Sequence, residues 1–98
     1  LEQWLDSTQA ANRIVVSHFI PSQKCNPERY KGSILTSAFV VELTELIEKF
    51  NIDYWIYGHH HYNMPEIEIN GCKLLTNQLG YLVLNENKGF RRDAVIEL

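Results

Sequence analysis

Two apolar runs, separated by a long loop and an amphipathic segment, most constrain what this chain can fold into. The first run, "RIVVSH" (13–18), contains three β-branched residues in succession, which is typical of an interior strand buried on both faces. The second, "DYWIYG" (53–58), has the same character. Because a helix is predicted between them, their order indicates a right-handed crossover that joins parallel strands. We therefore expect an α/β (α+β) fold.

Apolar spacing predicts a helix on each side of the first strand. Residues 1–12 place apolar side chains at helical intervals, so a helix should end near Asn12. A second helix is expected from Thr36 or Ser37, either of which suits an N-cap, to Phe50. Its apolar face should pack on the sheet while its acidic face meets water.

The second half of the chain reads as a series of short strands. "EIEI" (66–69) and "CKLLT" (72–76) flank Asn70-Gly71, a pair that suits the positive φ angles of a two-residue hairpin turn. Further strands are predicted at "YLVL" (81–84) and "AVIEL" (94–98).

Length and composition limit the function classes that suit this chain. At 98 residues, the chain suits a single domain, 1–98. A net charge of -3 and a pI near 5.7 argue against a broad nucleic-acid-binding surface, and no apolar run approaches the ~18 residues that cross a bilayer. Two cysteines are too few for a disulfide framework, which favours a reducing, cytoplasmic location. Since the only methionine is Met64, we expect the chain to be part of a longer protein.

All four histidines follow the two predicted parallel strands. His18 comes after the first strand, and His59, His60 and His61 come after the second. Ligands of open α/β sheets collect at this carboxyl edge, and neutral imidazole is a common metal ligand. In an extended segment, His59 and His61 would lie on one side and His60 on the other, with Gly58 allowing a tight turn. The spacing alone leaves open a metal site or a solvated loop tip.

Two motifs at these positions resemble the last two metal-binding blocks of the calcineurin-like metallophosphoesterases. They are "VVSHFIP" (15–21) and "YGHHH" (57–61), with a helix between them. The Gly-His-x-His block is matched from Gly58 to His61, although the family more often has Thr or Ser where this chain has His60. The resemblance implies a two-sheet β-sandwich flanked by helices, of which this chain would be the C-terminal half.

The resemblance also implies a metal-dependent phosphoesterase or phosphatase. His18 and His59 would bind one divalent transition metal ion (Mn, Fe or Zn) and His61 a second. Such ions hold phosphate oxygens and lower the pKa of a bridging water, which then hydrolyses the phosphoester substrate. The family's carboxylate-bearing blocks precede these two and do not occur in the 98 residues. We therefore expect half a site, an isolated fragment without activity, the N-terminal half of the same domain as a partner, and self-association of the fragment.

Candidate substrate-binding residues are His60, Lys24 and Arg29, the last two in a loop (19–32) that follows the first ligand. No catalytic side chain is assigned, and neither a membrane nor a nucleic-acid partner is expected. Two alternatives remain open. One is a non-catalytic interaction module. The other is a small mononuclear zinc domain that uses His18, His59 and His61, with or without a cysteine.

Overall fold

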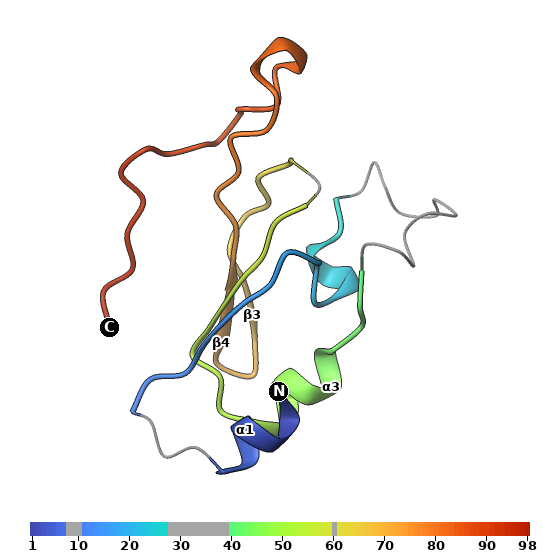
Figure 1. The fold of residues 1–98 in the computed structure, drawn as a ribbon, viewed down its shortest axis with the longest axis vertical. Helices are drawn as coiled ribbons and strands as arrows, with labels where there is room; N and C mark the ends of the chain where they lie inside the picture. The colour runs from blue at the N-terminus through green and yellow to red at the C-terminus, as the bar shows by residue number, and fades with distance from the viewer. Residues whose placement is uncertain (8–10, 28–39, 60) are drawn as a thin grey trace.

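A four-stranded mixed sheet forms the centre of a small α/β domain (Figure 1). The computed structural model describes residues 1–7, 11–27, 40–59 and 61–98. The strands are β1 (Ile14–Val16), β2 (Tyr54–Ile56), β3 (Ile67–Ile69) and β4 (Cys72–Leu75), in the order β1-β2-β4-β3. β2 pairs in parallel with both β1 and β4, while β3 pairs antiparallel with β4. The predicted parallel pairing of the first two strands is confirmed.

The hairpin was predicted correctly at its turn. Ile69 pairs with Cys72, which leaves Asn70 and Gly71 as the two turn residues. Their φ angles are 47° and 82°, both positive as a type I′ turn requires. The Asn70 side chain also donates to the carbonyl oxygen of Glu48 at 2.7 Å. The turn is therefore tied to the end of the helix that precedes β2.

The helices are shorter than periodicity predicted. α1 (Glu2–Ser7) does not reach Asn12, which is not helical. α3 (Thr44–Lys49) begins well after Thr36 and Ser37, which lie outside the described residues. A 3-10 turn, η1 (Gln23–Cys25), follows β1. α1 and α3 lie at one end of the sheet (Figure 1), and no helix among the described residues is long and apolar enough to cross a membrane.

Long-range backbone bonds explain the late start of α3. Val40 forms a parallel bridge with Ile20. Beyond it, the Val41 N–H donates to the Ile20 carbonyl at 2.9 Å, and the Leu43 N–H donates to the Pro21 carbonyl at 2.8 Å. These bonds hold residues 40–43 against the loop after β1, so the helical spacing of the apolar residues there is not realised.

The last two predicted strands are wrong. Residues 81–84 contain a 3-10 turn, η3 (Leu82–Leu84), and residues 94–98 are irregular. The Glu86 N–H donates to the Tyr81 carbonyl at 3.2 Å, which closes the chain locally. Val83 and Val95 are 91% and 83% exposed, so packing against a sheet does not stabilise an extended conformation at these residues.

β1 is an edge strand of the described sheet, not the interior strand that its sequence predicted. Val15 packs on the core, whereas Val16 is 72% and Ile14 38% exposed. The sheet is covered on one face only at this strand. The second sheet of the expected sandwich is not among the described residues.

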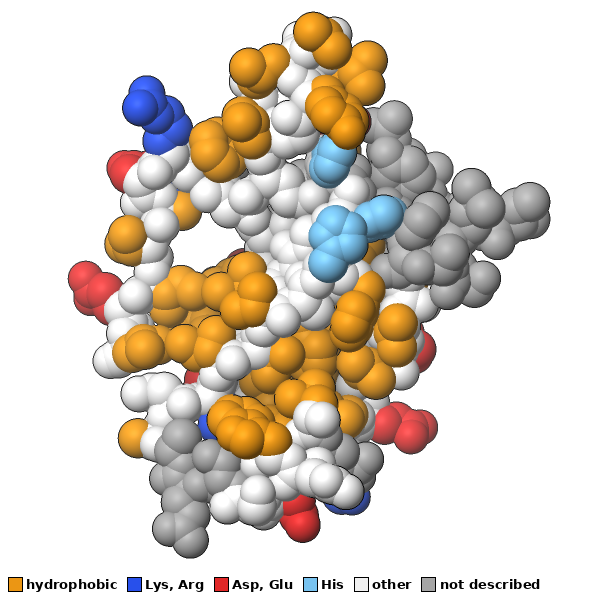
Figure 2. All heavy atoms as spheres, in the orientation of Figure 1, with side chains coloured by type: hydrophobic (Ala, Val, Ile, Leu, Met, Phe, Trp, Pro, Cys, Tyr) orange, Lys and Arg blue, Asp and Glu red, His pale blue; other side chains and the backbone are white. Residues whose placement is uncertain are grey.

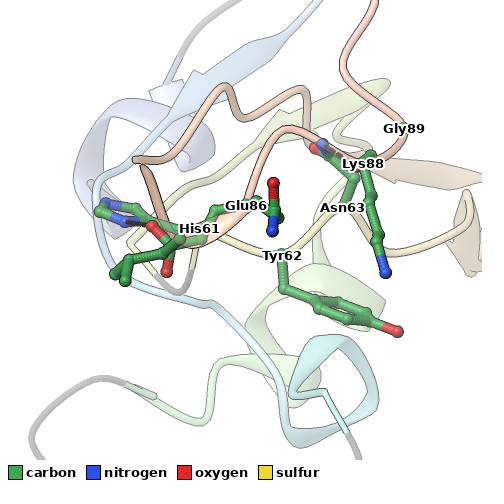
Figure 3. Close-up of a pocket in the computed structure, with 8 residues that line it drawn as sticks. His61, Tyr62, Asn63, Glu86, Lys88 and Gly89 are labelled. Atoms are coloured by element: carbon green, nitrogen blue, oxygen red, sulfur yellow. Dashed lines mark hydrogen bonds and ion pairs between the residues drawn. The ribbon is translucent and has the colours of Figure 1, made fainter. Parts of the chain in front are cut away.

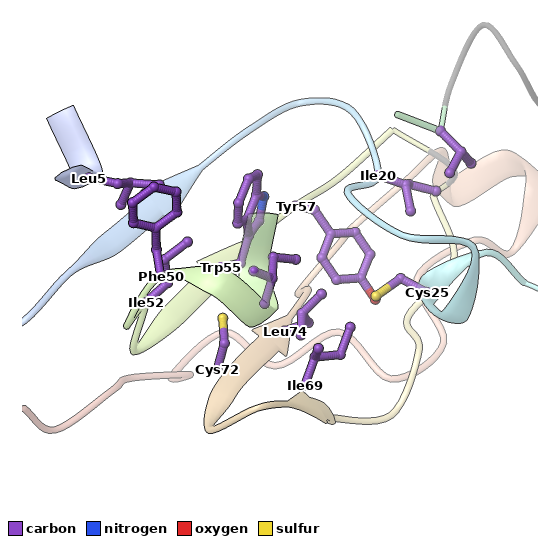
Figure 4. Close-up of a cluster of buried hydrophobic side chains, with 12 residues drawn as sticks. Leu5, Ile20, Cys25, Phe50, Ile52, Trp55, Tyr57, Ile69, Cys72 and Leu74 are labelled. Atoms are coloured by element: carbon purple, nitrogen blue, oxygen red, sulfur yellow. The ribbon is translucent and has the colours of Figure 1, made fainter. Parts of the chain in front are cut away.

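The core lies on the face of the sheet against which Val15 packs (Figure 4). Trp55 and Leu74, on adjacent strands, are fully buried and pack with Leu5 of α1 and Ile47 of α3. The Trp55 indole N–H donates to the Ser17 hydroxyl at 2.8 Å. The core therefore anchors the carboxyl ends of β1 and β2, where the histidines begin.

Candidate metal-binding site

The parallel pairing of β1 and β2 brings His18 and His59 to one edge of the sheet. The Ser17 N–H donates to the Ile56 carbonyl at 2.9 Å, which extends the pairing up to the residue before His18. The side chains of His18, one residue after Ser17, and His59, three residues after Ile56, are in contact. The described histidines lie together on one face of the molecule (Figure 2). The topological argument from the sequence therefore placed this pair correctly.

The two imidazoles are in direct contact. His18 Nε2 lies 2.9 Å from His59 Nδ1, and the rings are nearly perpendicular, at 85°. In the absence of an ion, one nitrogen donates a hydrogen bond and the other accepts it. The separation of 2.9 Å is that of a hydrogen bond between the two rings. Imidazole nitrogens are ligands of transition metal ions, so the donor atoms of the pair suit a divalent ion by their chemistry.

The environment of His59 favours the form that binds metal. Burial lowers its pKa below the ordinary value, and the neighbouring His18 and His61 act in the same direction. The charged imidazolium is disfavoured because it would be partly desolvated beside two further imidazoles. His59 therefore remains neutral to a lower pH than a solvated histidine, and only the neutral ring ligates metal.

The backbone of the histidine segment is not extended, contrary to the expectation from spacing. His59 and His61 have φ angles of 85° and 51°, in the left-handed region. Gly58 does not take this conformation, and a Cβ there would meet only the His18 carbonyl oxygen, at an ordinary 3.9 Å. The positive φ angles fall on His59 and His61, so the structure does not show the unusual backbone angles at Gly58 that a tight turn there would use.

His61 is held by groups other than the His18–His59 pair. Its N–H donates to Gln78 Oε1 at 2.7 Å, and its Nδ1 lies 3.0 Å from Glu86 Oε1. The Tyr81 ring packs edge-on against it, with the centroids 4.9 Å apart. Within the described part of the chain, no three His, Cys, Asp or Glu side chains converge on a possible ion position. His18 and His59 thus contact each other, whereas His61 is held by other groups.

A pocket of ≈ 520 Å³ adjoins His61 (Figure 3). His61 and Glu86 lie at one end of it, and Lys88 and Gly89 at the other. Asn63 connects two segments at the pocket, because its side-chain amide donates to the carbonyls of Gln78 and Lys88 at 2.7 and 2.8 Å. The pocket therefore combines a histidine, a carboxylate and a cation in reach of solvent.

Not all predicted site residues can be placed. His60 and Arg29 lie outside the described residues. Lys24 lies in η1 with an exposed side chain, and it does not line the pocket beside His61. Cys25 and Cys72 are free thiols buried in the core, and neither joins a described cluster that could hold metal.

Spacing did not identify Gln78 and Glu86 as neighbours of the site. They lie 17 and 25 residues from His61, one before and one after the segment 81–84 that was expected to be a strand. Turn-forming residues in "LNENKG" (84–89) were the available signal that this segment folds back on itself.

Comparison with models of protein families, with curated proteins and with solved structures finds no match to this chain. The family resemblance therefore depends on the motifs at 15–21 and 57–61.

Proposed function

We propose that this chain contributes histidine ligands to the site of a metal-dependent phosphoesterase. The observation that carries the proposal is the contact between His18 and His59 at the carboxyl ends of adjacent parallel strands. This is the edge where α/β sheets bind their ligands. Both residues also belong to the motifs on which the resemblance depends. Geometry and motif thus favour the same two side chains.

The proposed roles follow the grouping of the histidines. His18 and His59 would hold one divalent ion, and His61 would take part in holding a second. When bound, the ions would position the phosphoester oxygens and lower the pKa of a water molecule. Imidazole suits Zn and Fe, while Mn usually takes more oxygen ligands. The histidines themselves bind and orient; none of them is assigned a proton-transfer step.

The remaining ligands are proposed to come from the N-terminal half of the same domain. Two imidazoles cannot neutralise a divalent ion, so carboxylates are needed to complete the site. The exposed side of β1, where Val16 is 72% exposed, provides an apolar surface next to the histidine edge for such a half to cover. The two reduced thiols suit a protein of the cytoplasm.

One observation favours the alternative of an interaction module. An apolar groove of ≈ 790 Å³ lies on the open face of the sheet, between strand residues Ile56 and Leu75 and the segment 94–96. An apolar groove of this kind can bind a protein partner without catalysing a reaction. Metal binding distinguishes the two proposals, because an interaction module has no need of the histidines.

Metal titration of the purified full-length protein tests the phosphoesterase proposal. His18→Ala and His59→Ala are expected to abolish tight uptake of Zn²⁺ or Mn²⁺, as followed by isothermal titration calorimetry. His60→Ala is the matched control, since it removes a histidine of the same cluster to which no ligand role is assigned. Equal losses in all three variants would contradict the assignment, and so would unchanged binding in His18→Ala and His59→Ala.

Acidification gives an independent test. The histidines must lose metal as they become protonated, so bound metal should fall as the pH is lowered. The lowered pKa of His59 should delay its protonation relative to a solvated histidine. Metal content that stays constant through pH 5 would argue against imidazole ligation. In the full-length protein, metal-dependent hydrolysis of an aryl phosphate should be lost in His59→Ala.

A further inference from the structure

Glu86 makes two contacts around His61 through a single oxygen atom. Oε1 lies 3.0 Å from His61 Nδ1 and accepts the backbone N–H of Tyr81 at 2.7 Å. The Tyr81 ring packs edge-on against the His61 ring. The ring is therefore held from two sides, by the carboxylate and by the tyrosine that the same carboxylate anchors.

These contacts determine which imidazole nitrogen carries the proton. An ionised carboxylate only accepts hydrogen bonds, so His61 Nδ1 must be the donor to Glu86. In the neutral ring, the proton on Nδ1 leaves the lone pair on Nε2. Glu86 thereby selects Nε2 as the nitrogen that can bind a metal ion.

The backbone of His61 supports the same orientation. Its φ angle of 51° is unusual for a residue with a side chain, and the bond from its N–H to Gln78 Oε1 stabilises it. Gln78 is itself held, since its side-chain amide donates to Thr76 Oγ1 at 2.8 Å. Side chains far apart in sequence thus hold both the backbone and the ring of His61.

We propose that Glu86 is a positioning residue for His61, whose carboxylate holds Nδ1–H and presents Nε2 as the metal-binding nitrogen. The inference rests on the proposed function, because it assigns His61 a ligand role. Metal-binding histidines commonly donate their other ring N–H to a carboxylate, and removal of such a partner typically lowers metal affinity about 10–100-fold.

The tautomer of His61 tests the proposal without metal. Long-range ¹H–¹⁵N correlation spectra of the ¹⁵N-labelled protein near neutral pH should show Nδ1 protonated and Nε2 unprotonated. In Glu86→Ala, we expect the ring to shift toward the Nε2–H form. Glu86→Gln keeps an acceptor oxygen and should keep the Nδ1–H form, which separates positioning of the ring from a general loss of structure. An Nε2–H tautomer in the wild type would overturn the proposal.

Metal affinity is the second readout. Zn²⁺ titration, followed at the His61 ring signals, should show an affinity about 10–100-fold lower in Glu86→Ala, with Glu86→Gln closer to wild type. Lys88→Ala is the control, because its side chain lines the other end of the same pocket, away from the imidazole. Equal affinities in wild type and Glu86→Ala would refute the positioning role. An Nδ1–H tautomer combined with no metal uptake at any histidine would instead refute the phosphoesterase proposal and, with it, the ligand role of Nε2.

Discussion

Replacement of Ser17 by alanine should destabilise the fold because it removes the hydrogen-bond acceptor of Trp55. The Ser17 hydroxyl accepts the indole N–H of Trp55 at 2.8 Å and donates to the Phe19 carbonyl at 2.8 Å. Trp55 is fully buried, so its N–H cannot reach water once the hydroxyl is gone. An unsatisfied buried donor costs about 1–3 kcal/mol. Phe19 is only partly buried, so its carbonyl can be hydrated and adds little.

Urea unfolding followed by tryptophan fluorescence measures this effect. For a domain of this size, each kcal/mol also lowers Tm by about 4–8 °C. Ser7→Ala is the matched control, because the Ser7 hydroxyl bonds to the Gln3 carbonyl at 2.9 Å on the exposed side of α1. Its loss should change the free energy of unfolding by less than about 0.5 kcal/mol. If Ser17→Ala is no more destabilising than Ser7→Ala, the argument from the buried indole is wrong.

Three further perturbations follow from the core and the turns. Alkaline pH should destabilise the fold, because burial raises the pKa of Cys25 from 9.0 to about 11 and that of Cys72 to about 12. The buried neutral thiols stabilise the folded state below about pH 9, by a few kcal/mol at ~1.4 kcal/mol per pKa unit. This stabilisation is lost as the pH rises through the pKa values of the two thiols in the folded state. Unfolding free energies at about pH 8 and about pH 11 should therefore differ less in a Cys25→Ala, Cys72→Ala variant; an unchanged difference would exclude the thiols as the cause. Gly71→Ala should cost about 1–2 kcal/mol, the price of a left-handed alanine, since its methyl group meets nothing within 4 Å. Gly80→Ala should cost more in the same unfolding assay, because φ is also positive there and the methyl group would collide with the Glu86 side chain; equal losses would contradict this reasoning.

The parts of the fold that were predicted correctly depend on local chemistry. Asn70-Gly71 specifies its turn through the φ angles that these two residues tolerate, and the hairpin follows from it. β2 has the aromatic and β-branched residues of a strand, and it is one. Once two strands run in parallel, their carboxyl ends meet, which is why the contact between His18 and His59 could be expected.

The errors occur where distant contacts override a local pattern. The helical spacing before Thr44 is overridden by backbone bonds from Val41 and Leu43 to the loop after β1. The apolar run at 81–84 would suit a strand, but it has no sheet neighbour in the described structure and closes into a 3-10 turn. In the first case, the long-range hydrogen bonds outweigh the small helical preference of the residues. In the second, no neighbouring strand stabilises the extended conformation that the residues prefer.

The sequence by itself determined the elements with strong local preferences, the parallel direction of β1 and β2, and the approach of His18 to His59 at one edge of the sheet. Only the tertiary structure decided that β1 lies at an edge of the described sheet, that His59 and His61 adopt left-handed backbone angles, and that Glu86 meets His61. The physical reason is range. Backbone preferences act over a few residues, whereas the hydrogen bond between His61 and Glu86 joins groups 25 residues apart and exists only after the chain has folded.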